Sequence, residues 1–578
     1  MKRFFLILTL GGLLSASAHA QQESVIRLNQ VGVSPSQEKT VVFDGMDPKD
    51  AVVVKKLQPN GKWVKVKGKW PVSRKATSAW SDRTRYLVDV SSLQECGEYM
   101  VCCKKQSAVL KVVEHPVHDI AVGALKAFYL IRSGMPIESA YAGVWSRPNG
   151  HRDTEVLVHP SAASDERPAG TVISSPKGWY DAGDYNKYVV NSAFSIGLML
   201  CCYQENTGYF ASLDTHIPES GNKTPDVLDE MMYNLEWLLT MQEPSDGGVY
   251  HKLTTPSFEA FIMPADCKQK RYVVQKSVTA TLDFAAVMAQ AARIFNGNPD
   301  YPEFSNTALK AAKKAYEWAK QHPEMWYEQN EINKKYEVKV TTGEYGDRNA
   351  DDEWFWAATE LYLSTGENTY LKDAEKTLPK QFSNPTWSDV AALGLYEWVA
   401  CFFTNPFTST ARQYLEKYSQ EILKTLPTSC FNSVYGNQKG NFYWGCLAEC
   451  CCQAVSLLYA DKYVGKGNYR SQAFLNADYL LGCNPLGYCY VTGFGTKSPM
   501  HPHHRISEAD GIAPPFPGLL VGGPNPGQQD KAGGNLVYPS NVPDESYVDD
   551  MNSYASNEIA INWNASLVAM LCWLDALH

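Results

Sequence analysis

Two aspartates stand three residues apart in a segment of glycine and aromatic residues. Residues 178–188 read GWYDAGDYNKY, which places carboxyl groups at Asp181 and Asp184. One of the two fits the N-cap of a following helix, where a side-chain oxygen accepts a hydrogen bond from the first turn. That role explains neither the second aspartate nor the four aromatic residues around the pair. Neighbouring carboxyl groups raise one another's pKa and can share a water molecule, so the segment predicts general-base chemistry.

A second group of reactive side chains lies near the C-terminus. Residues 501–505 read HPHHR. Three histidines in four positions resemble a metal site, but no HExxH helix or neighbouring carboxylate accompanies them, and Pro502 favours an extended chain. His503 and Arg505 fit better as hydrogen-bond donors to the hydroxyl groups of a sugar, and the metal site stays as the alternative.

A third candidate is Glu558, which opens the last predicted helix. It follows the segment YVDDMNSYASN at 547–557 and has apolar neighbours on its own turn. Partial removal of a carboxyl group from water raises its pKa and fits it to donate a proton near neutral pH. The sequence thus offers a candidate acid and a candidate base.

The region before residue 115 has the pattern of β-strands. Short apolar runs alternate with turn residues such as those at 59–61, which read PNG. Seven such runs in about 90 residues are typical of an immunoglobulin-like β-sandwich, which we place at 21–115. The runs are 25–28, 40–43, 51–54, 63–66, 85–88, 98–101 and 108–113.

From residue 116 to 578 the pattern is helical. Twelve apolar-periodic segments without intervening strands predict six helical hairpins, closed into an (α/α)6 barrel or stacked as an open solenoid. The segments share no sequence repeat, which favours the barrel. Two irregular stretches, 134–187 and 484–556, are long enough to carry function. The predicted helices are 118–133, 188–206, 225–242, 275–296, 304–321, 352–365, 368–379, 386–402, 408–425, 443–462, 467–482 and 557–576.

Composition and charge restrict the classes of partner. The 578 residues carry a net charge of −9, which disfavours a nucleic-acid partner, and 12% are aromatic, which suits stacking on sugar rings. Residues 1–20 read as an export signal with a cleavage site at 18–20, so we expect a secreted or periplasmic protein. No cysteine follows the cleavage site, so no lipid anchor is expected, and no later apolar run is long enough to span a membrane. A monomer is expected.

Fifteen cysteines would suit a disulfide framework in an exported protein, but their number is odd. Most are adjacent to one another or lack the spacing of metal ligands. We therefore predict that most are small buried hydrophobic residues, with any pairing left open.

These segments together resemble glycoside hydrolase family 9, the inverting cellulase family built on an (α/α)6 barrel. The matching elements are the DAGDY block at 181–185, the segment from Val491 to Arg505 with its H-x-R element, and a C-terminal signature. The RLNQVG sequence at 27–32 resembles the start of the immunoglobulin-like module found in one branch of the family. The C-terminal signature falls at Tyr547, Asp549, Tyr554, Glu558, Asn564 and Ala565.

The resemblance implies inverting hydrolysis of β-1,4-glucosidic bonds in β-glucans by an endo-acting enzyme. It makes Asp184 the general base, Asp181 its partner on the same water, and Glu558 the general acid. Asp549 would orient the acid side. Inversion requires the two catalytic carboxyl groups to stand roughly 6.5–9.5 Å apart. The substrate-binding residues that the resemblance implies are Trp179, Tyr250, His251, His503, Arg505, Tyr554 and Trp563.

The resemblance also bears on metals, although the chemistry itself requires no cofactor. Relatives with the β-domain often hold zinc through cysteine and histidine in the loop before the DAGDY block. Here residues 149–161 contain no cysteine, so a zinc of that type is not expected. The family's calcium position resembles Asp352, Glu353 and Asp389, although an acidic helix start explains the first two equally well.

Three alternatives remain open at this point. An exo-acting enzyme of the same family would be a cellodextrinase, a cellobiohydrolase or an exo-glucosaminidase. A sugar-binding protein without catalysis would not need both Asp184 and Glu558, and a structural adhesin would account only for residues 24–113. The exact glucan, whether plain cellulose, xyloglucan, mixed-linkage glucan or an amino sugar, is not specified by these residues.

Overall fold

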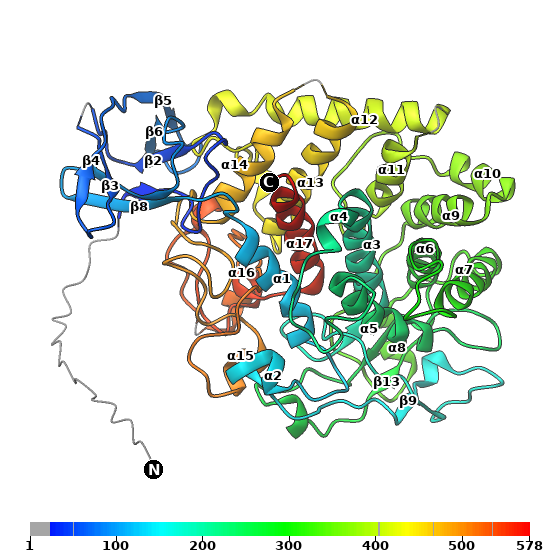
Figure 1. The fold of residues 1–578 in the computed structure, drawn as a ribbon. Coiled ribbons are helices and arrows are strands. Elements are labelled where there is room, and N and C mark those ends of the chain that lie inside the picture. Colours follow the sequence, from blue (N-terminus) through cyan, green and yellow to red (C-terminus); the bar gives the residue numbers. More distant parts are fainter. Residues whose placement is uncertain (1–23, 50, 403–404, 466, 535) are drawn as a thin grey trace, which may run out of the picture.

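The computed structural model describes residues 24–578 apart from 50, 403–404, 466 and 535. The predicted export signal at 1–20 lies outside these residues. A β-sandwich forms the N-terminal part, ending with β8 at Val112, and helix α1 begins at His118. Figure 1 shows the sandwich in blue beside helix α14 (Tyr469–Leu480) of the larger helical domain.

The sandwich contains eight strands among the described residues, in two antiparallel sheets. Alternating inward residues such as Val41, Phe43, Val88 and Val101 are fully buried between the sheets. Seven strands match the predicted runs, and β5 was missed because its sequence, VSRKAT, is mostly polar. One sheet has the order β1 (Ile26–Arg27), β2 (Thr40–Asp44), β6 (Thr84–Asp89), β5 (Val72–Thr77), and the other β4 (Trp63–Lys65), β3 (Val53–Leu57), β7 (Gly97–Cys103), β8 (Gln106–Val112).

Each of the twelve predicted helical segments contains a helix, and these helices form a closed double ring. Each inner helix packs against the next, and α17 packs against both α13 and α3, which closes the ring and excludes the open solenoid. The inner helices are α3 (Val189–Glu205), α6 (Val278–Ile294), α9 (Asp351–Thr365), α11 (Ala391–Ala400), α13 (Cys446–Tyr463) and α17 (Ile561–Ala576). The outer helices are α1 (His118–Leu130), α5 (Asp226–Thr240), α7 (Phe304–Gln321), α10 (Asn368–Lys376), α12 (Pro406–Leu423) and α14 (Tyr469–Leu480).

Sequence pattern separates the inner helices from the outer ones. Helix α3 is buried at every residue from Val189 to Cys202, whereas α7 buries one face and exposes lysines on the other. A helix that is apolar all round belongs in a protein interior, and an amphipathic one belongs on its surface. The distribution of apolar residues around a helix therefore indicates whether the helix belongs to the inner or to the outer ring.

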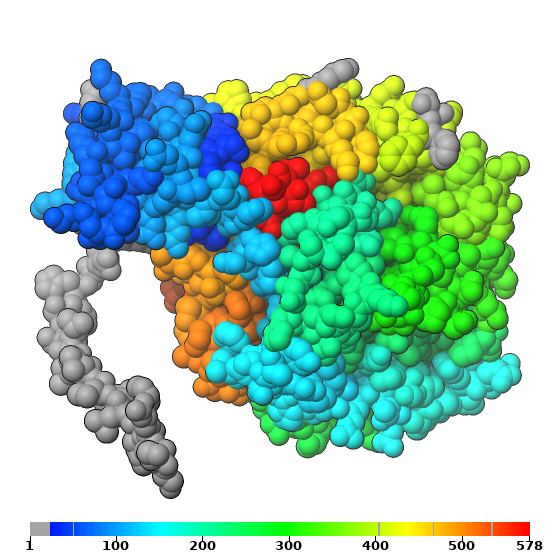
Figure 2. Space-filling view, viewed as in Figure 1, coloured from blue at the N-terminus to red at the C-terminus, as the bar shows by residue number. Residues whose placement is uncertain are grey.

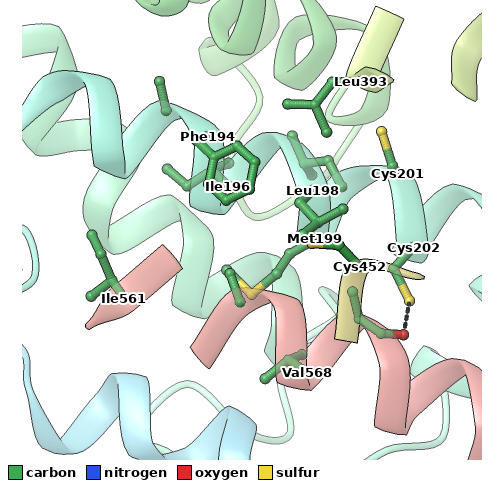
Figure 3. Close-up of a cluster of buried hydrophobic side chains, with 14 of the residues drawn as sticks. Phe194, Ile196, Leu198, Met199, Cys201, Cys202, Leu393, Cys452, Ile561 and Val568 are labelled. Carbon is green, nitrogen blue, oxygen red and sulfur yellow. Dashed lines mark hydrogen bonds between the residues drawn. The ribbon is translucent and has the colours of Figure 1, made fainter. Parts of the chain in front are cut away.

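Cysteines fill part of this interior. Figure 3 shows Cys201, Cys202 and Cys452 among apolar side chains of α3, α11 and α17, with the Cys202 thiol donating to the carbonyl of Ala569 at 3.3 Å. None of the fifteen cysteines, all of them within the described residues, forms a disulfide, and ten are buried. The prediction that most of them are small buried hydrophobic residues is confirmed.

The long irregular stretches and the connection between α5 and α6 contain structure that periodicity did not predict. Five strands of two or three residues form a small sheet in the order β10 (Val172–Ile173), β9 (Val156–Val158), β13 (Tyr272–Val273), β12 (Lys252–Thr254), β11 (Lys187–Tyr188). Strand β11 leads directly into α3, so this sheet lies at the end of the barrel where the inner helices begin. Single bridges join His503 of the second stretch to Glu558, and Ala182 of the first stretch to Ala560.

Buried polar contacts connect the sandwich to the barrel. The Asn29 amide donates to Asp478 of α14 at 2.7 Å, and Arg85, which is fully buried, lies 3.9 Å from Asp544 and 3.7 Å from Glu545. Figure 2 shows the two parts in continuous contact. Within the described part of the chain, no helix has both the length and the apolar character of a membrane span.

Candidate active site

The beginnings of the inner helices meet at one end of the barrel. Alternate helices of successive hairpins run in the same direction, so all six inner N-termini face the same side. A cavity of 770 Å³ lies there. Seven of the residues predicted from sequence line it: Asp181, Asp184, His503, Arg505, Tyr554, Glu558 and Trp563.

Asp181 and Asp184 are both buried in the wall of this cavity. Asp181 accepts hydrogen bonds from the Asn191 amide at 2.6 Å and from the Tyr345 hydroxyl at 2.8 Å. Asp184 accepts from the backbone N–H of Asn186 at 3.3 Å and from the side-chain amide of the same residue. Burial, reinforced by the charge of Asp184, raises the pKa of Asp181 to about 8. Two carboxyl groups this close cannot both ionise cheaply, so near neutral pH the pair retains one proton.

Glu558 faces the same cavity from the segment that precedes α17. Burial and then the charge of Asp184 raise the pKa of the Glu558 carboxyl well above its ordinary value, against the opposing effect of Arg505. A carboxyl group with a raised pKa keeps its proton near neutral pH and can donate it. The site therefore places a proton donor opposite a carboxylate pair.

Gly183 connects the two sides of the site. Its N–H donates to Glu558 Oε1 at 3.3 Å, and its carbonyl accepts from the backbone N–H of Arg505 at 3.1 Å and from Arg505 Nη1 at 2.8 Å. A Cβ on this residue would lie 2.1 Å from the carbonyl oxygen of His503. Glycine is required at position 183 because the two backbone segments approach so closely. Backbone strain is not the reason, because the φ of Gly183 is not positive.

His503 presents a hydrogen-bond acceptor to the cavity, and Arg505 presents donors. His503 Nδ1 donates to the Met551 carbonyl at 2.6 Å, which leaves Nε2 as the nitrogen available to a ligand. Burial lowers the pKa of His503 to about 4, so the ring is neutral. Arg505 Nε donates to the Glu259 carbonyl at 2.7 Å, and its guanidinium lies 5.5 Å from the Phe258 ring.

Four further predicted residues lie outside the cavity. Trp179 is fully buried against Phe128 and donates to Glu230 at 2.8 Å, so its prediction as a sugar-binding residue is wrong. Its indole bonds Glu230 of α5, whereas Asp181, two residues later, bonds Asn191 and Tyr345.

Tyr250 and His251 lie behind the cavity wall. The Tyr250 hydroxyl donates to Glu243 at 3.2 Å, away from the site. His251 stacks on Tyr327 at 4.2 Å, and its Nε2 donates to the carbonyl of Glu344 at 2.8 Å. His251 thus supports the segment that presents Tyr345, and neither residue reaches the cavity as predicted.

Asp549 also lies outside the cavity. Its carboxylate accepts from the backbone N–H groups of Met500 at 2.8 Å and His501 at 2.9 Å, and from the Asn557 amide at 3.1 Å. It therefore ties the histidine segment to the residue before Glu558. These hydrogen bonds position the backbone next to Glu558, and Asp549 itself does not line the cavity.

Several residues of the site were not predicted. Tyr345 bonds Asp181 and packs edge-on against Trp387, with ring centroids 5.0 Å apart. Trp387 and Trp444 lie just before α11 and α13. Because every inner helix begins at the cavity, this position marks both tryptophans as lining residues once the ring of helices is known. Tyr188, Phe258, Gly343, Glu344 and Asn562 complete the lining together with these three residues and with Ala182 and Ala560.

Lys252 is a buried cation behind the carboxylate pair. Burial lowers the pKa of Lys252 to about 7, against the opposing charges of Asp184, Glu344 and Asp181. Its ammonium donates to Gln329 at 2.7 Å, to Thr342 at 3.0 Å and to the carbonyl of Gly343. It fixes the segment that carries Tyr345.

The residues named for calcium lie at the start of α9 (Asp352 and Glu353) and shortly before α11 (Asp389). Asp352 accepts from the Val390 N–H at 2.8 Å, and Asp389 accepts from the Ser383 hydroxyl at 2.6 Å. Glu353 is fully buried, and burial and then the charges of Asp283 and Asp352 raise the pKa of its carboxyl group well above its ordinary value. Among the residues that the structure describes, no group of three or more His, Cys, Asp or Glu side chains is arranged to hold a metal ion. These residues therefore do not fit a calcium site, and we assign it no part in the reaction.

The loop associated with zinc in relatives is occupied by internal contacts. Asp153 forms ion pairs with Lys187 at 2.7 Å and with Arg271 at 2.9 Å. His151 bonds the Tyr180 hydroxyl at 2.9 Å, and His159 bonds Ser161 at 2.8 Å. These side chains are committed to the protein itself.

Comparisons with known proteins agree with this architecture. A model of glycosyl hydrolase family 9 matches residues 118–571, and one of the cellulase N-terminal Ig-like domain matches residues 21–108. A protein of Bacteroides ovatus named xyloglucan-specific endo-β-1,4-glucanase is 52% identical over 563 residues, which is 96% of this chain and 94% of that protein. Endoglucanase D of Acetivibrio thermocellus is 33% identical over 567 residues, covering 95% and 83% of the two chains.

A solved structure supports the same assignment. That of a Bacteroides ovatus GH9 protein superposes with a TM-score of 0.90 at 51% identity, over 96% of this chain and 99% of the other. The family match spans most of the chain and includes the cavity with its carboxyl groups. The chain therefore belongs to glycosyl hydrolase family 9 and is a glycoside hydrolase of the endo-β-1,4-glucanase type.

Proposed function

We propose that this enzyme cleaves β-1,4-glucosidic bonds within the main chain of a β-glucan, with inversion at the anomeric carbon, and that xyloglucan is its preferred glucan. The observation that carries the mechanism is one cavity in which a protonated Glu558 faces the Asp181–Asp184 pair. The preference for xyloglucan is supported by the name of the Bacteroides ovatus relative, at 52% identity.

Glu558 acts as the general acid. Its proton passes to the glycosidic oxygen while the bond from that oxygen to the anomeric carbon breaks. The raised pKa, due first to burial and then to Asp184, keeps this proton in place near neutral pH. General-acid help of this kind contributes about 10²–10⁴-fold to the rate.

Asp184 acts as the general base, with Asp181 as its partner on the same water. The water attacks the anomeric carbon from the face opposite the leaving oxygen, and Asp184 takes its proton. Asp181 is fixed by Asn191 and Tyr345, so it can orient the water. Direct attack by water inverts the anomeric centre, which calls for a spacing of roughly 6.5–9.5 Å between Asp184 and Glu558.

The remaining cavity residues bind the glucan. His503 Nε2 and the Arg505 guanidinium are placed to bond hydroxyl groups of the sugar at the broken bond. Trp387, Trp444 and Trp563 offer flat apolar surfaces for pyranose rings. An exo-acting enzyme of the same family is the second candidate, and the size distribution of products over time separates the two.

The test is Glu558→Gln, which keeps the shape of the side chain but cannot donate the proton. We expect hydrolysis of xyloglucan and cello-oligosaccharides to fall by about 10²–10⁴-fold, with substrate binding retained. Aryl glycosides with good leaving groups need no proton, so their hydrolysis should be far less affected. An equal loss on both kinds of substrate would show that Glu558 is not the acid, and a product of retained configuration would refute direct attack by water.

A further inference from the structure

A second cavity shares a wall with the catalytic cavity. This side cavity has a volume of 410 Å³ and lies beside the segments that precede α11 and α13. Thr386 and Tyr443 line it, and the residue after each of them, Trp387 and Trp444, lines the catalytic cavity. Consecutive Cα atoms are about 3.8 Å apart, so at these two positions a single layer of chain separates the cavities.

The surface of the side cavity suits a neutral sugar. Asn384 and Gln453 contribute amides, which both donate and accept hydrogen bonds, and Glu449 contributes a carboxyl group. Tyr418 and Tyr443 supply ring faces for the apolar side of a pyranose. The residues that line it, all within the described part of the chain, include no lysine, arginine or histidine, which disfavours an anionic ligand.

The polar groups of the side cavity are held in place but not all satisfied. Asn384 Oδ1 accepts from the Ser456 hydroxyl at 3.0 Å, and Gln453 Oε1 accepts from the Asn476 amide at 3.5 Å. The Tyr418 hydroxyl lies near both of these amides, yet it is buried and makes no hydrogen bond of good geometry. A ligand hydroxyl that bonds it would satisfy this buried group.

The size and position of the side cavity favour a branch over the main chain. Its volume lies near the lower end of the range for small-ligand sites, about 300–1,000 Å³. The main chain needs the aromatic surfaces of Trp387 and Trp444, which face the other cavity. A sugar linked to the main chain beside these tryptophans would have to pass their edge to reach the side cavity.

We propose that the side cavity binds a neutral sugar branch of the glucan whose main chain occupies the catalytic cavity. This inference rests on the proposed function, because it assigns the preference for xyloglucan to residues of this chain. The branch hydroxyl groups bond Asn384 and Gln453, and its ring lies against Tyr443.

The test compares branched and unbranched substrates of equal main-chain length. The variants are Asn384→Ala and Tyr443→Ala, and Tyr443 is 41% exposed, so its truncation opens no core. Lys439→Ala is the matched control: it is an exposed residue of the same segment that lines a different cavity. Initial rates are measured on xyloglucan oligosaccharides and on cello-oligosaccharides, and thermal melting verifies folding.

The measured quantity is kcat/KM on the branched substrate divided by kcat/KM on the unbranched substrate. We expect each variant to lower this ratio by tenfold or more and the control to leave it unchanged. An equal fall on both substrates would make the side cavity a main-chain or structural feature and overturn the inference. An unchanged ratio would overturn it too. Failure of the proposed function would be seen in the wild-type enzyme itself, which would then hydrolyse neither the branched nor the unbranched substrate.

Calorimetry on the Glu558→Gln variant gives a second measurement, independent of turnover. Xyloglucan oligosaccharide should bind it more tightly than cello-oligosaccharide, and adding Asn384→Ala should remove most of that difference. A difference that survives Asn384→Ala and Tyr443→Ala together would place the recognition of branches elsewhere.

Discussion

Replacing Gly183 with alanine tests whether the reaction depends on the exact placement of the catalytic groups. The added Cβ would lie 2.1 Å from the His503 carbonyl oxygen and 2.9 Å from His503 Cδ2, whereas ordinary contact begins at 3.4 Å. The closest atom is backbone, so no side-chain rotation relieves the clash. In a close-packed interior, the segments of Gly183 and His503 must therefore move apart by about 1.3 Å.

This displacement acts on both halves of the site. Asp184 moves with Gly183, while Glu558 and Arg505 lose contacts at 3.3 Å and 2.8 Å. A misplacement of about 1 Å can cost 10²-fold in rate, so we expect kcat/KM to fall by about 100-fold. Since the Gly183 N–H lowers the pKa of Glu558, its loss should also move the alkaline limb of the pH profile upward.

The assay is the initial rate of reducing-end release from soluble β-glucan, with thermal melting measured in parallel. Overpacking costs about 1–3 kcal/mol, less than the stability of an ordinary domain, so the variant should stay folded at the assay temperature. Gly208→Ala is the control, because Gly208 is an exposed residue with no atom within 4 Å of its added Cβ. A folded Gly183→Ala enzyme with kcat/KM within threefold of the wild type would refute the reasoning.

Three further predictions address the base, the buried acid Asp283 and the sandwich. Asp184→Ala should remove nearly all activity and be partly rescued by azide with inverted product, whereas Asp181→Ala should show weaker rescue; rescue of Asp181→Ala alone would reverse the two roles. Burial, then Asp352 and Asp347, raises the pKa of Asp283 well above its ordinary 3.8, so the folded state holds a proton that the unfolded state releases, and stability should fall as pH rises above about 4. Melting curves from pH 5 to 8 should show a smaller decline for Asp283→Asn, and an identical decline would contradict this. Arg85→Ala leaves buried Asp544 without its cation, whereas Glu545 keeps Arg83 at 3.5 Å, and the change should cost about 3–5 kcal/mol in urea unfolding; an unchanged midpoint would show that the sandwich is held by other contacts.

Long periodic elements were predictable from the sequence, and short ones were not. Twelve helices have enough turns for an apolar period to stand out. Strands such as β9 and β11 contain two or three residues, too few for any period, and form only because barrel and loops bring them together. Strand β5 pairs with β6 along the edge of its sheet, where a polar sequence is tolerated.

The site was predictable only where its residues stand in characteristic local sequence. Asp181, Asp184 and Glu558 are marked by unusual neighbours, whereas Tyr345 lies 164 residues from the aspartate to which it bonds. That contact depends on closure of the helical ring, which no local pattern encodes. The prediction for Trp179 was wrong because closeness in sequence to Asp181 does not determine which side of the chain a side chain faces.

The protonation of the site follows from burial and not from the helix ends that surround it. Six inner helices point their N-termini at the cavity, and such ends favour negative charge by about 0.3–1 kcal/mol each. Raising the pKa of Asp181 from 3.8 to about 8 corresponds to roughly 6 kcal/mol disfavouring the charged form, even with two hydrogen bonds donated to it. Helix ends act most strongly on groups in their first turn, and Asp181 precedes α3 by eight residues. Desolvation therefore outweighs the helix ends, and the closed ring contributes to the chemistry by excluding water around carboxyl groups that must hold a proton.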